Sequence, residues 1–345
     1  MDIKQLYKKI GLPRLIIASF LLILFITAYI LGIPLAGLWG DILVRFGMNG
    51  ILVLAMVPSI QSGIGLNFNL ALGVIFGLIG ALVSIEMALS GWPSFFVALA
   101  VAIPLAIIAG YLYGLMLNRV KGDEMTVGNY VGFSMVSIMC IFWLLAPFKS
   151  PELVWALGGK GLRVTASMES SMGKLLNEFL AFNIGNVRVP TGLLLTFGFF
   201  ATLVWIFGKS KRGNTMKVAG SNEAFAISNG INVDHQRILG TILSTVLGAV
   251  GIIVYSQAFG FLQLYTAPLY VAMPAVASIL IGGSSIKSSK IIHVIIGTFL
   301  FQGLLVVALP VINIISEGSM SEIVRIIISN GIILYALTRT GGEAI

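Results

Sequence analysis

The sequence predicts an all-α polytopic membrane protein that crosses the bilayer about ten times. Hydrophobic residues make up 58% of the 345 positions and charged residues only 10%, with a mean hydropathy of +1.02. A soluble domain carries roughly 25% charged residues, because water must cover its surface. Lipid must therefore cover much of this protein. Of the 40 glycines, 21 lie inside long apolar runs, as is typical of close-packed membrane helices.

A membrane-spanning helix needs about 20 mostly apolar residues. The runs that meet or nearly meet this length are 15–36, 42–60, 69–90, 93–118, 127–146, 190–207, 237–260, 266–283, 290–310 and 321–338. The first run follows basic residues, which is the pattern of a signal peptide. However, the run is long enough to span the membrane, and no small-residue cleavage site clearly follows it. We therefore interpret it as a retained helix. No soluble domain fits between the runs, and a single transmembrane domain is expected over 1–345.

The distribution of Lys and Arg predicts the orientation, because cytoplasmic loops carry an excess of these residues. With ten spans and an inside N-terminus, the cytoplasmic segments hold most of the 21 basic residues, namely Lys4, Lys8, Lys9, Arg14, Arg119, Lys121, Lys209, Lys211, Arg212, Lys217, Arg237, Lys287, Lys290 and Arg339. Both termini are then cytoplasmic, with 208–236 inside and 147–189 outside. This arrangement accounts for the net charge of +8 without nucleic acid as a partner.

The outer loop 147–189 contains a stretch, from Met168 to Phe182, that is expected to form a surface helix. Two interpretations of the loop remain open. It is either a packed extracytoplasmic cap or a docking surface for a partner outside the cell.

Catalytic and metal-binding functions find little support in the sequence. His235 and His293 have no metal-ligand spacing around them, and no Walker A glycine loop is present to bind ATP. Glu86 is the one acidic residue well within a span; it lies near the outer end, where a structural role is favoured over a functional one. The absence of paired carboxylates disfavours a proton-driven transporter, although sodium coupling through backbone carbonyls remains open.

The stretch from Gln61 to Asn69, read as QSGIGLNFN, interrupts two apolar runs. It is either an ordinary cytoplasmic turn or a broken helix whose freed backbone groups face a cavity. Irregular backbone is tolerated at membrane depth only where protein or water satisfies it.

The cytoplasmic segment from Gly213 to Asp234 predicts a short helix. Ser221 or Asn222 is suited to cap its start, Glu223 lies in its first turn, and Gly230 is suited to end it in the left-handed conformation. An apolar side is provided by Ala224, Phe225 and Ile227. Because so short a helix is marginal alone, it must be held against something. It is either a simple connection or a helix presented to a cytoplasmic partner.

Three stretches resemble ABC-importer permeases of the ribose and simple-sugar branch, within the larger group that includes branched-chain amino acid permeases. They are 218–224 followed by 228–233 (VAGSNEA and SNGINV), 62–66 (SGIGL) and 278–283 (SILIGG). Family members read close to G-x-N-x-x-A-A-x-x-S-G-I-N in the first stretch. The chain departs from the family where Gly65 stands in place of a usual Asp, and its 147–189 loop is longer and more charged than usual.

The resemblance implies a type II-like permease with two inverted five-helix halves in the plasma or inner membrane. Its implied partners are a second permease copy or paralogue, cytoplasmic ATPase subunits and an extracytoplasmic substrate-binding protein. No cofactor is expected in this chain, because the ATPase would bind ATP and Mg²⁺. The coupling helix would comprise Ser221, Asn222, Glu223, Ala224, Phe225, Ile227 and Gly230.

A simple sugar, such as a pentose, a hexose or a related polyol, is the expected substrate. The candidate pathway residues are uncharged hydrogen-bonding groups suited to sugar hydroxyls, namely Gln61, Asn67, Asn69, Gln257 and Gln302. Such residues also commonly bond neighbouring helices. A nucleoside importer of similar architecture is the alternative, and a gradient-driven transporter is the main alternative from another class.

Overall fold

The computed structural model describes residues 12–155 and 161–315, with 326–327, 330–331 and 334 near the C-terminus. The long helices are α2 (Leu12–Ile30), α3 (Leu35–Leu54), α5 (Leu70–Glu86), α6 (Gly91–Arg119), α7 (Glu124–Leu145), α9 (Thr191–Lys209), α12 (Val233–Phe259) and α15 (Ile291–Ile315). Shorter helices are α4 (Met56–Gln61), α8 (Leu175–Glu178), α10 (Lys211–Ser221), α11 (Glu223–Ser228), α13 (Ala267–Tyr270) and α14 (Ala272–Ile281).

Among the described residues, six helical segments are long and apolar enough to cross a membrane: Leu35–Gln61, Gly91–Arg119, Glu124–Leu145, Thr191–Lys209, Val233–Phe259 and Ile291–Ile315. Shorter apolar helices cover Arg14–Ile30, Leu70–Glu86 and Ala267–Ile281. Together these segments coincide with every predicted span except 321–338, most of which lies outside the described residues. The chain is therefore a multi-pass, predominantly helical membrane protein. The first predicted run extended too far, because the helix ends at Ile30 before a turn that contains Pro34.

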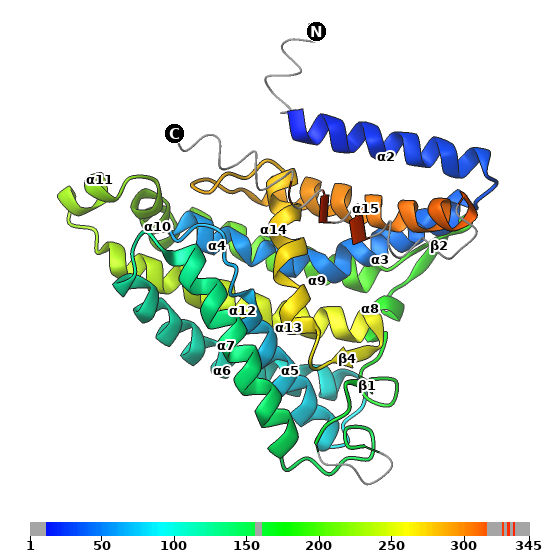
Figure 1. Ribbon diagram of the computed structural model, residues 1–345, viewed down its shortest axis with the longest axis horizontal. Helices are drawn as coiled ribbons and strands as arrows, with labels where there is room; N and C mark the ends of the chain where they lie inside the picture. Colours follow the sequence, from blue (N-terminus) through cyan, green and yellow to red (C-terminus); the bar gives the residue numbers. More distant parts are fainter. Residues whose placement is uncertain (1–11, 156–160, 316–325, 328–329, 332–333, 335–345) are drawn as a thin grey trace, which may run out of the picture.

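Helix α12 forms the centre of the bundle (Figure 1). It packs against α3, α4, α5 and α6, while α3 packs in turn against α14 and α15. Most residues of α12 and of the α3–α4 segment are buried, whereas most residues of α6, α7 and α9 are partly or fully exposed. The exposed side chains of these outer helices are largely apolar, for example Ile108, Phe133 and Leu195. Such a surface is unfavourable in water and suits a lipid environment.

The 147–189 loop folds as a packed cap on one end of the bundle. Its strand β1 (Thr165–Ser167) pairs antiparallel with β4 (Phe261–Gln263), which directly follows α12. A second pair, β2 (Phe182–Ile184) and β3 (Val187–Val189), forms a hairpin before α9. The apolar side chains Leu153, Leu162, Ala166, Met168, Met172 and Leu176 are fully or almost fully buried. This packing agrees with the cap interpretation of the loop.

The prediction of a surface helix between Met168 and Phe182 is wrong. Only the four residues Leu175–Glu178 are helical, and Phe182 already belongs to strand β2. A tight turn forms instead, in which the carbonyl of Met168 accepts hydrogen bonds from the backbone N–H groups of Ser171 and Gly173. Lys174 then adopts a left-handed conformation with φ of 58°. Met168 and Met172 are both buried within the cap, and this burial outweighs the local preference for a helix.

Candidate functional site

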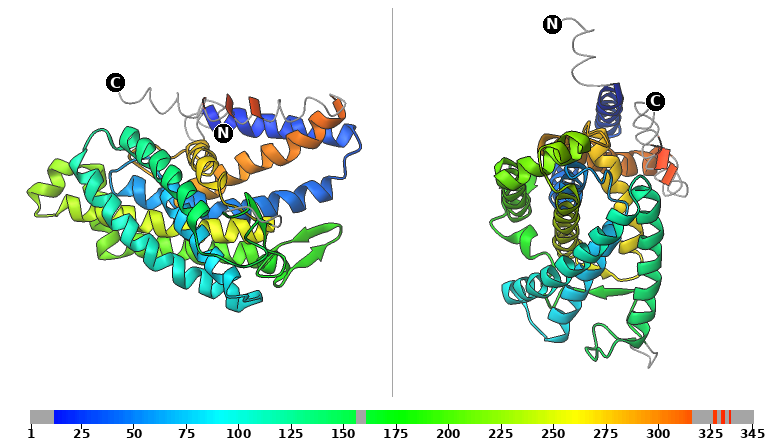
Figure 2. Two further views of the ribbon diagram at one scale, coloured as in Figure 1. Left: turned by 60° about the horizontal axis from the view of Figure 1, so that its bottom comes forward. Right: turned by 90° about the vertical axis from the view of Figure 1, so that its left-hand side faces the viewer.

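The short helix predicted in the segment 208–236 is present as α11, at the end of the bundle opposite the 147–189 cap (Figures 1 and 2). Asn222 caps its start, since its side-chain oxygen accepts a hydrogen bond of 3.0 Å from the backbone N–H of Phe225. Gly230 ends it with φ of +74°, and the next N–H, that of Ile231, bonds back to the carbonyl of Ala226 at 3.0 Å. This is the capped geometry that a short helix needs.

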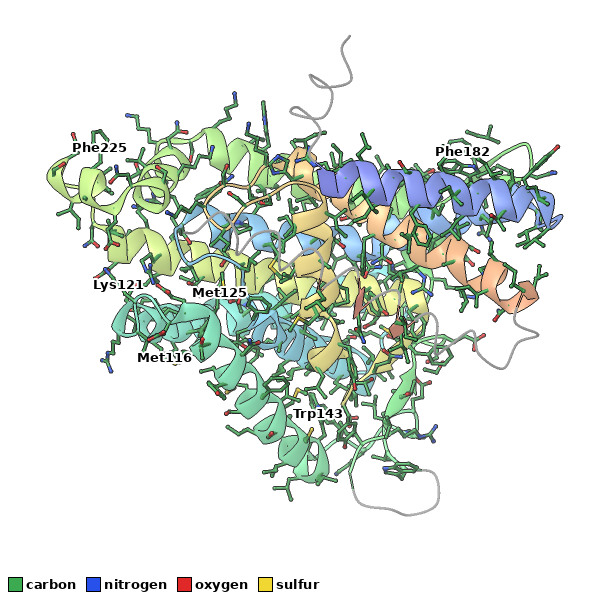
Figure 3. All side chains as sticks on the ribbon, turned by 45° about the horizontal axis from the view of Figure 1, so that its top comes forward. Met116, Lys121, Met125, Trp143, Phe182 and Phe225 are labelled. Carbon is green, nitrogen blue, oxygen red and sulfur yellow. The ribbon has the colours of Figure 1, made fainter. Side chains whose placement is uncertain are left out.

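One narrow side of α11 packs against the protein. Ala226 is fully buried, together with Ala219 and Val233. Phe225 and Ile227 are 55% and 60% exposed, and Figure 3 shows Phe225 at the outer edge of the molecule. The expected apolar side made by Ala224, Phe225 and Ile227 is therefore not covered by the described part of this chain, because the small Ala226 makes the close contact instead. The larger apolar side chains remain free to meet another molecule.

Lys121, in the turn between α6 and α7, ties α11 to the start of α12. Its Nζ lies 2.8 Å from a carboxylate oxygen of Asp234 and 3.0 Å from one of Glu223. Hydrogen bonds to these carboxylates, first Asp234 and then Glu223, raise the pKa of Lys121 above its usual value. All three side chains are more than a third exposed, so each ion pair contributes at most about 1 kcal/mol. The contact orients α11 more than it stabilises the fold.

Arg237 forms a second, buried connection one turn further along α12. Only 4% exposed, it forms an ion pair with the Glu124 carboxylate at the start of α7. It also donates a hydrogen bond of 2.9 Å to the side-chain oxygen of Asn118 and one of 3.4 Å to the carbonyl of Gly63. A single guanidinium thus links α12, α6, α7 and the turn after α4. Removing one partner of such a buried pair typically costs about 3–5 kcal/mol.

Helix α10 rests on the same turn through Gly220. A side chain at this position would place its Cβ 2.3 Å from the carbonyl oxygen of Gln61 and 2.6 Å from the backbone nitrogen of Gly63. These separations are far inside van der Waals contact, so only glycine allows the two backbones to approach this closely. The segment 208–236 is therefore in direct backbone contact with the interrupted stretch 61–69.

The interrupted stretch lies inside the bundle, and most of its residues are buried. Helix α4 ends at Gln61 and α5 begins at Leu70. The 17 residues of α5 span only about 26 Å, whereas the hydrocarbon core is about 30 Å thick. Side chains satisfy part of the irregular backbone: the Ser59 hydroxyl donates to the carbonyl of Gly65 at 2.9 Å. These features match the broken-helix interpretation rather than an exposed cytoplasmic turn.

Two of the predicted pathway residues carry unused hydrogen-bonding capacity. The amide nitrogen of Asn67 donates to Ser244 in the middle of α12 at 2.8 Å, but its oxygen has no hydrogen-bond partner within the described residues. Within the described residues, neither the nitrogen nor the oxygen of the buried Asn69 side-chain amide has a hydrogen-bond partner of good geometry. The Tyr113 hydroxyl lies close by. Unsatisfied buried polar atoms are rare and point to water, a ligand or a moving part.

The other three predicted pathway residues lie elsewhere. Gln61 donates to the carbonyl of Ser289 at 2.8 Å, at the end of α4. Gln257 lies near the C-terminal end of α12, where its oxygen accepts from the N–H of Leu176 in α8 at 3.0 Å. Gln302 is buried within α15. Asn67 and Asn69 thus share one buried stretch but contact different helices, α12 and α7, and the remaining candidates lie elsewhere in the bundle. The role of all five residues in transport stays a prediction.

A small hollow of about 70 Å³ lies between α5, α7 and the α13–α14 pair. Its lining includes Phe68 from the interrupted stretch, and Asn129 and Phe133 from α7. Gly132, which also lines it, lies directly against the Asn69 side chain. Asn129 was not among the predicted pathway residues, although its place as a polar residue inside the apolar run 127–146 was an available signal.

Glu86 has a structural role, as the sequence favoured. It is the last residue of α5, and its carboxylate accepts hydrogen bonds of 3.0–3.1 Å from the backbone N–H groups of Lys149 and Ser150. It therefore anchors the start of the outer loop.

Comparison with protein families agrees with the architecture described above. A family described as "Branched-chain amino acid transport system / permease component" matches residues 38–336. This range covers the bundle from the second predicted span onward, the interrupted stretch and the cytoplasmic segment. No curated protein and no solved structure matches the chain significantly.

Proposed function

The chain belongs to this family of branched-chain amino acid transport permeases, and we propose that it is the membrane subunit of an ATP-driven importer of a simple sugar. A permease component is a transport subunit and not an enzyme. One observation supports the ATP-driven class most directly. Helix α11 exposes Phe225 and Ile227 at one end of the bundle, while the helices on either side of it, α10 and α12, contact the buried stretch 61–69 through Gly220 and Arg237.

In this proposal, a separate cytoplasmic ATPase subunit binds ATP and Mg²⁺ and docks on α11. Its closure moves α11, and two contacts carry that movement inward: the backbone approach of Gly220 to Gln61, and the buried hydrogen bond of Arg237 to Gly63. The ATPase must bind α11 differently in its open and closed states, because otherwise no conformational equilibrium shifts.

The proposed complex contains a second permease, either a copy of this chain or a paralogue, and an extracytoplasmic substrate-binding protein. Within each permease, two inverted five-helix halves would be related. The packing supports this relation, since α12 packs on α5 and α6 in the way that α3 packs on α14 and α15. The distribution of Lys and Arg supports cytoplasmic termini, with α11 inside and the 147–189 cap outside.

The polar groups near the hollow support a neutral, hydroxyl-rich substrate. Asn67, Asn69 and Asn129 offer amide donors and acceptors, and the residues that line the hollow include no charged side chain. An amino acid zwitterion would favour charged partners, whereas sugar hydroxyls require hydrogen bonds. The aromatic faces of Phe68 and Phe133 would also suit a nucleobase, which keeps a nucleoside as the second candidate.

The decisive experiment isolates the tagged protein in a mild detergent and identifies its partners by mass spectrometry, together with an ATPase assay. We expect a nucleotide-binding subunit and ATP hydrolysis to co-purify. The receptor that accompanies them is then titrated with pentoses, hexoses and nucleosides, and sugar binding is expected. Purification of the chain without an ATPase, combined with sodium-dependent uptake in vesicles, would refute the ATP-driven class in favour of a gradient-driven transporter.

A further inference from the structure

The β2–β3 hairpin has one apolar and one polar face. Residues directly opposite each other in an antiparallel pair share a face, and successive residues alternate between faces. The register pairs Asn183 with Arg188 on the polar face. The two flanking pairs make the apolar face, which consists of Phe182, Val189, Ile184 and Val187.

The apolar face is open along strand β2. Phe182 is 50% exposed and Ile184 is 64% exposed, whereas Val187 and Val189 are partly exposed, and Figure 3 shows Phe182 at the end of the molecule away from Phe225. In the left view of Figure 2 the hairpin lies at the right-hand end of the bundle. A two-stranded hairpin is marginally stable in water, and clustered exposed apolar side chains mark an interaction surface.

The polar face has a different environment. Arg188 lines a hollow of about 310 Å³, together with Asp41, Lys174 and Glu178. None of the four apolar-face residues is part of that lining. The hairpin therefore has a charged, water-accessible hollow on one side and requires an apolar medium on the other.

The position of the hairpin identifies that medium as lipid. Val189 precedes the start of the membrane-spanning helix α9 by a single proline, Pro190. The backbone of Arg188 lies against Gly40 of α3, next to Trp39, which is 40% exposed. Partly exposed tryptophan is typical of the membrane–water boundary. The apolar face thus continues the lipid-facing surface of the bundle at the level where the helices leave the bilayer.

We propose that the β2–β3 hairpin is a membrane-interface element, with its apolar face in the lipid of the leaflet on the side of the 147–189 cap. Arg188 lines the aqueous hollow, and Asn183 lies on the same polar face of the hairpin. This inference requires only that the chain spans a membrane, so it does not depend on the proposed transport function. It assigns to the charged outer loop a contact with the bilayer itself.

The test uses single cysteines, because Cys140 is the only native one. In a Cys140→Ser background, Ile184→Cys reports the apolar face and Asn183→Cys, one residue away, is the matched control. Each full-length variant is labelled with a nitroxide and reconstituted in phosphatidylcholine–phosphatidylglycerol vesicles. Collision rates are measured with oxygen, which concentrates in lipid, and with a water-soluble nickel chelate. We expect the oxygen-to-nickel ratio to be several-fold higher at Ile184 than at Asn183.

Phe182→Cys, on the same face as Ile184, must give the same result. High nickel accessibility at both faces would overturn the proposal, because the hairpin would then project into water. Protection of Ile184 from both reagents would also overturn it, since a protein contact would then cover this face. Both primary sites are exposed, so substitution there is expected to preserve folding, which monodisperse elution of each variant verifies.

Discussion

The two longest polar stretches of the chain, 147–189 and 208–236, lie at opposite ends of the bundle and are held in opposite ways (Figure 1). The 147–189 cap buries five large apolar side chains and Ala166, and its strand β1 pairs with β4, which follows α12. The 208–236 segment buries fewer apolar side chains, namely Met216 and the cluster of Ala219, Ala226 and Val233, and is fixed by the exposed Lys121 and the buried Arg237. A cap held by extensive packing is rigid, whereas a segment held at a few points can move as one unit relative to the bundle.

The comparison predicts separate effects on the free energy of unfolding and on the binding of an ATPase partner. The following substitutions are ordered by their expected effect on the free energy of unfolding.

Arg237→Ala should have the largest effect, because it leaves the Glu124 carboxylate buried without its partner. We expect a loss of about 3–5 kcal/mol, measured as a lower thermal midpoint in detergent. The double variant Arg237→Met, Glu124→Met serves as the control, and it should recover most of the stability, since apolar pairs often replace buried ion pairs at little cost. Equal stability of the single and double variants would contradict the proposed importance of the charge pair.

Leu176→Ala should destabilise the 147–189 cap, because Leu176 belongs to the cap and its side chain is almost fully buried. The expected cost is about 2–5 kcal/mol from lost apolar burial and the cavity left behind. ATPase co-purification should nevertheless persist, since the cap lies far from α11. Loss of the ATPase at a temperature where this variant remains folded would show that the two ends are not separable.

Lys121→Ala should cost at most about 1 kcal/mol, because the ion pairs that it removes are exposed. A measurable loss of transport per ATP hydrolysed is expected, since α11 loses its tie to the turn between α6 and α7. Lys211→Ala, on α10 and outside this ion-pair cluster, is the matched control. Unchanged coupling in Lys121→Ala would remove this contact from the proposed transmission.

Phe225→Asp should leave the free energy of unfolding within about 0.5 kcal/mol of the wild-type value, because the side chain is exposed. The ATPase subunit should fail to co-purify, since a carboxylate would replace the apolar group offered for docking. Glu223→Lys should give a weaker defect of the same kind through repulsion from Lys121. Normal ATPase binding by Phe225→Asp would count against α11 as the coupling helix.

Much of the fold could be predicted from the sequence, because its signals are local. Apolar runs of sufficient length identified the spans, since each must bury its own backbone hydrogen bonds within lipid. The cap at Asn222 and the end at Gly230 follow from residues only three or four positions apart. The same local reasoning failed for 168–182, where burial of Met168 and Met172 overrides helix propensity.

The sequence by itself determined the class of the protein, the spans and the short capped helix, since composition and hydrogen bonds between near neighbours fix them. Only the tertiary structure decided that Arg237 reaches Glu124 and Gly63, that Ala226 rather than Phe225 faces inward, and that the stretch 61–69 is buried. These features depend on which distant segments meet. The sequence alone does not show whether a charged or amide side chain faces water, lipid or a buried partner. The packing of the folded protein determines that environment.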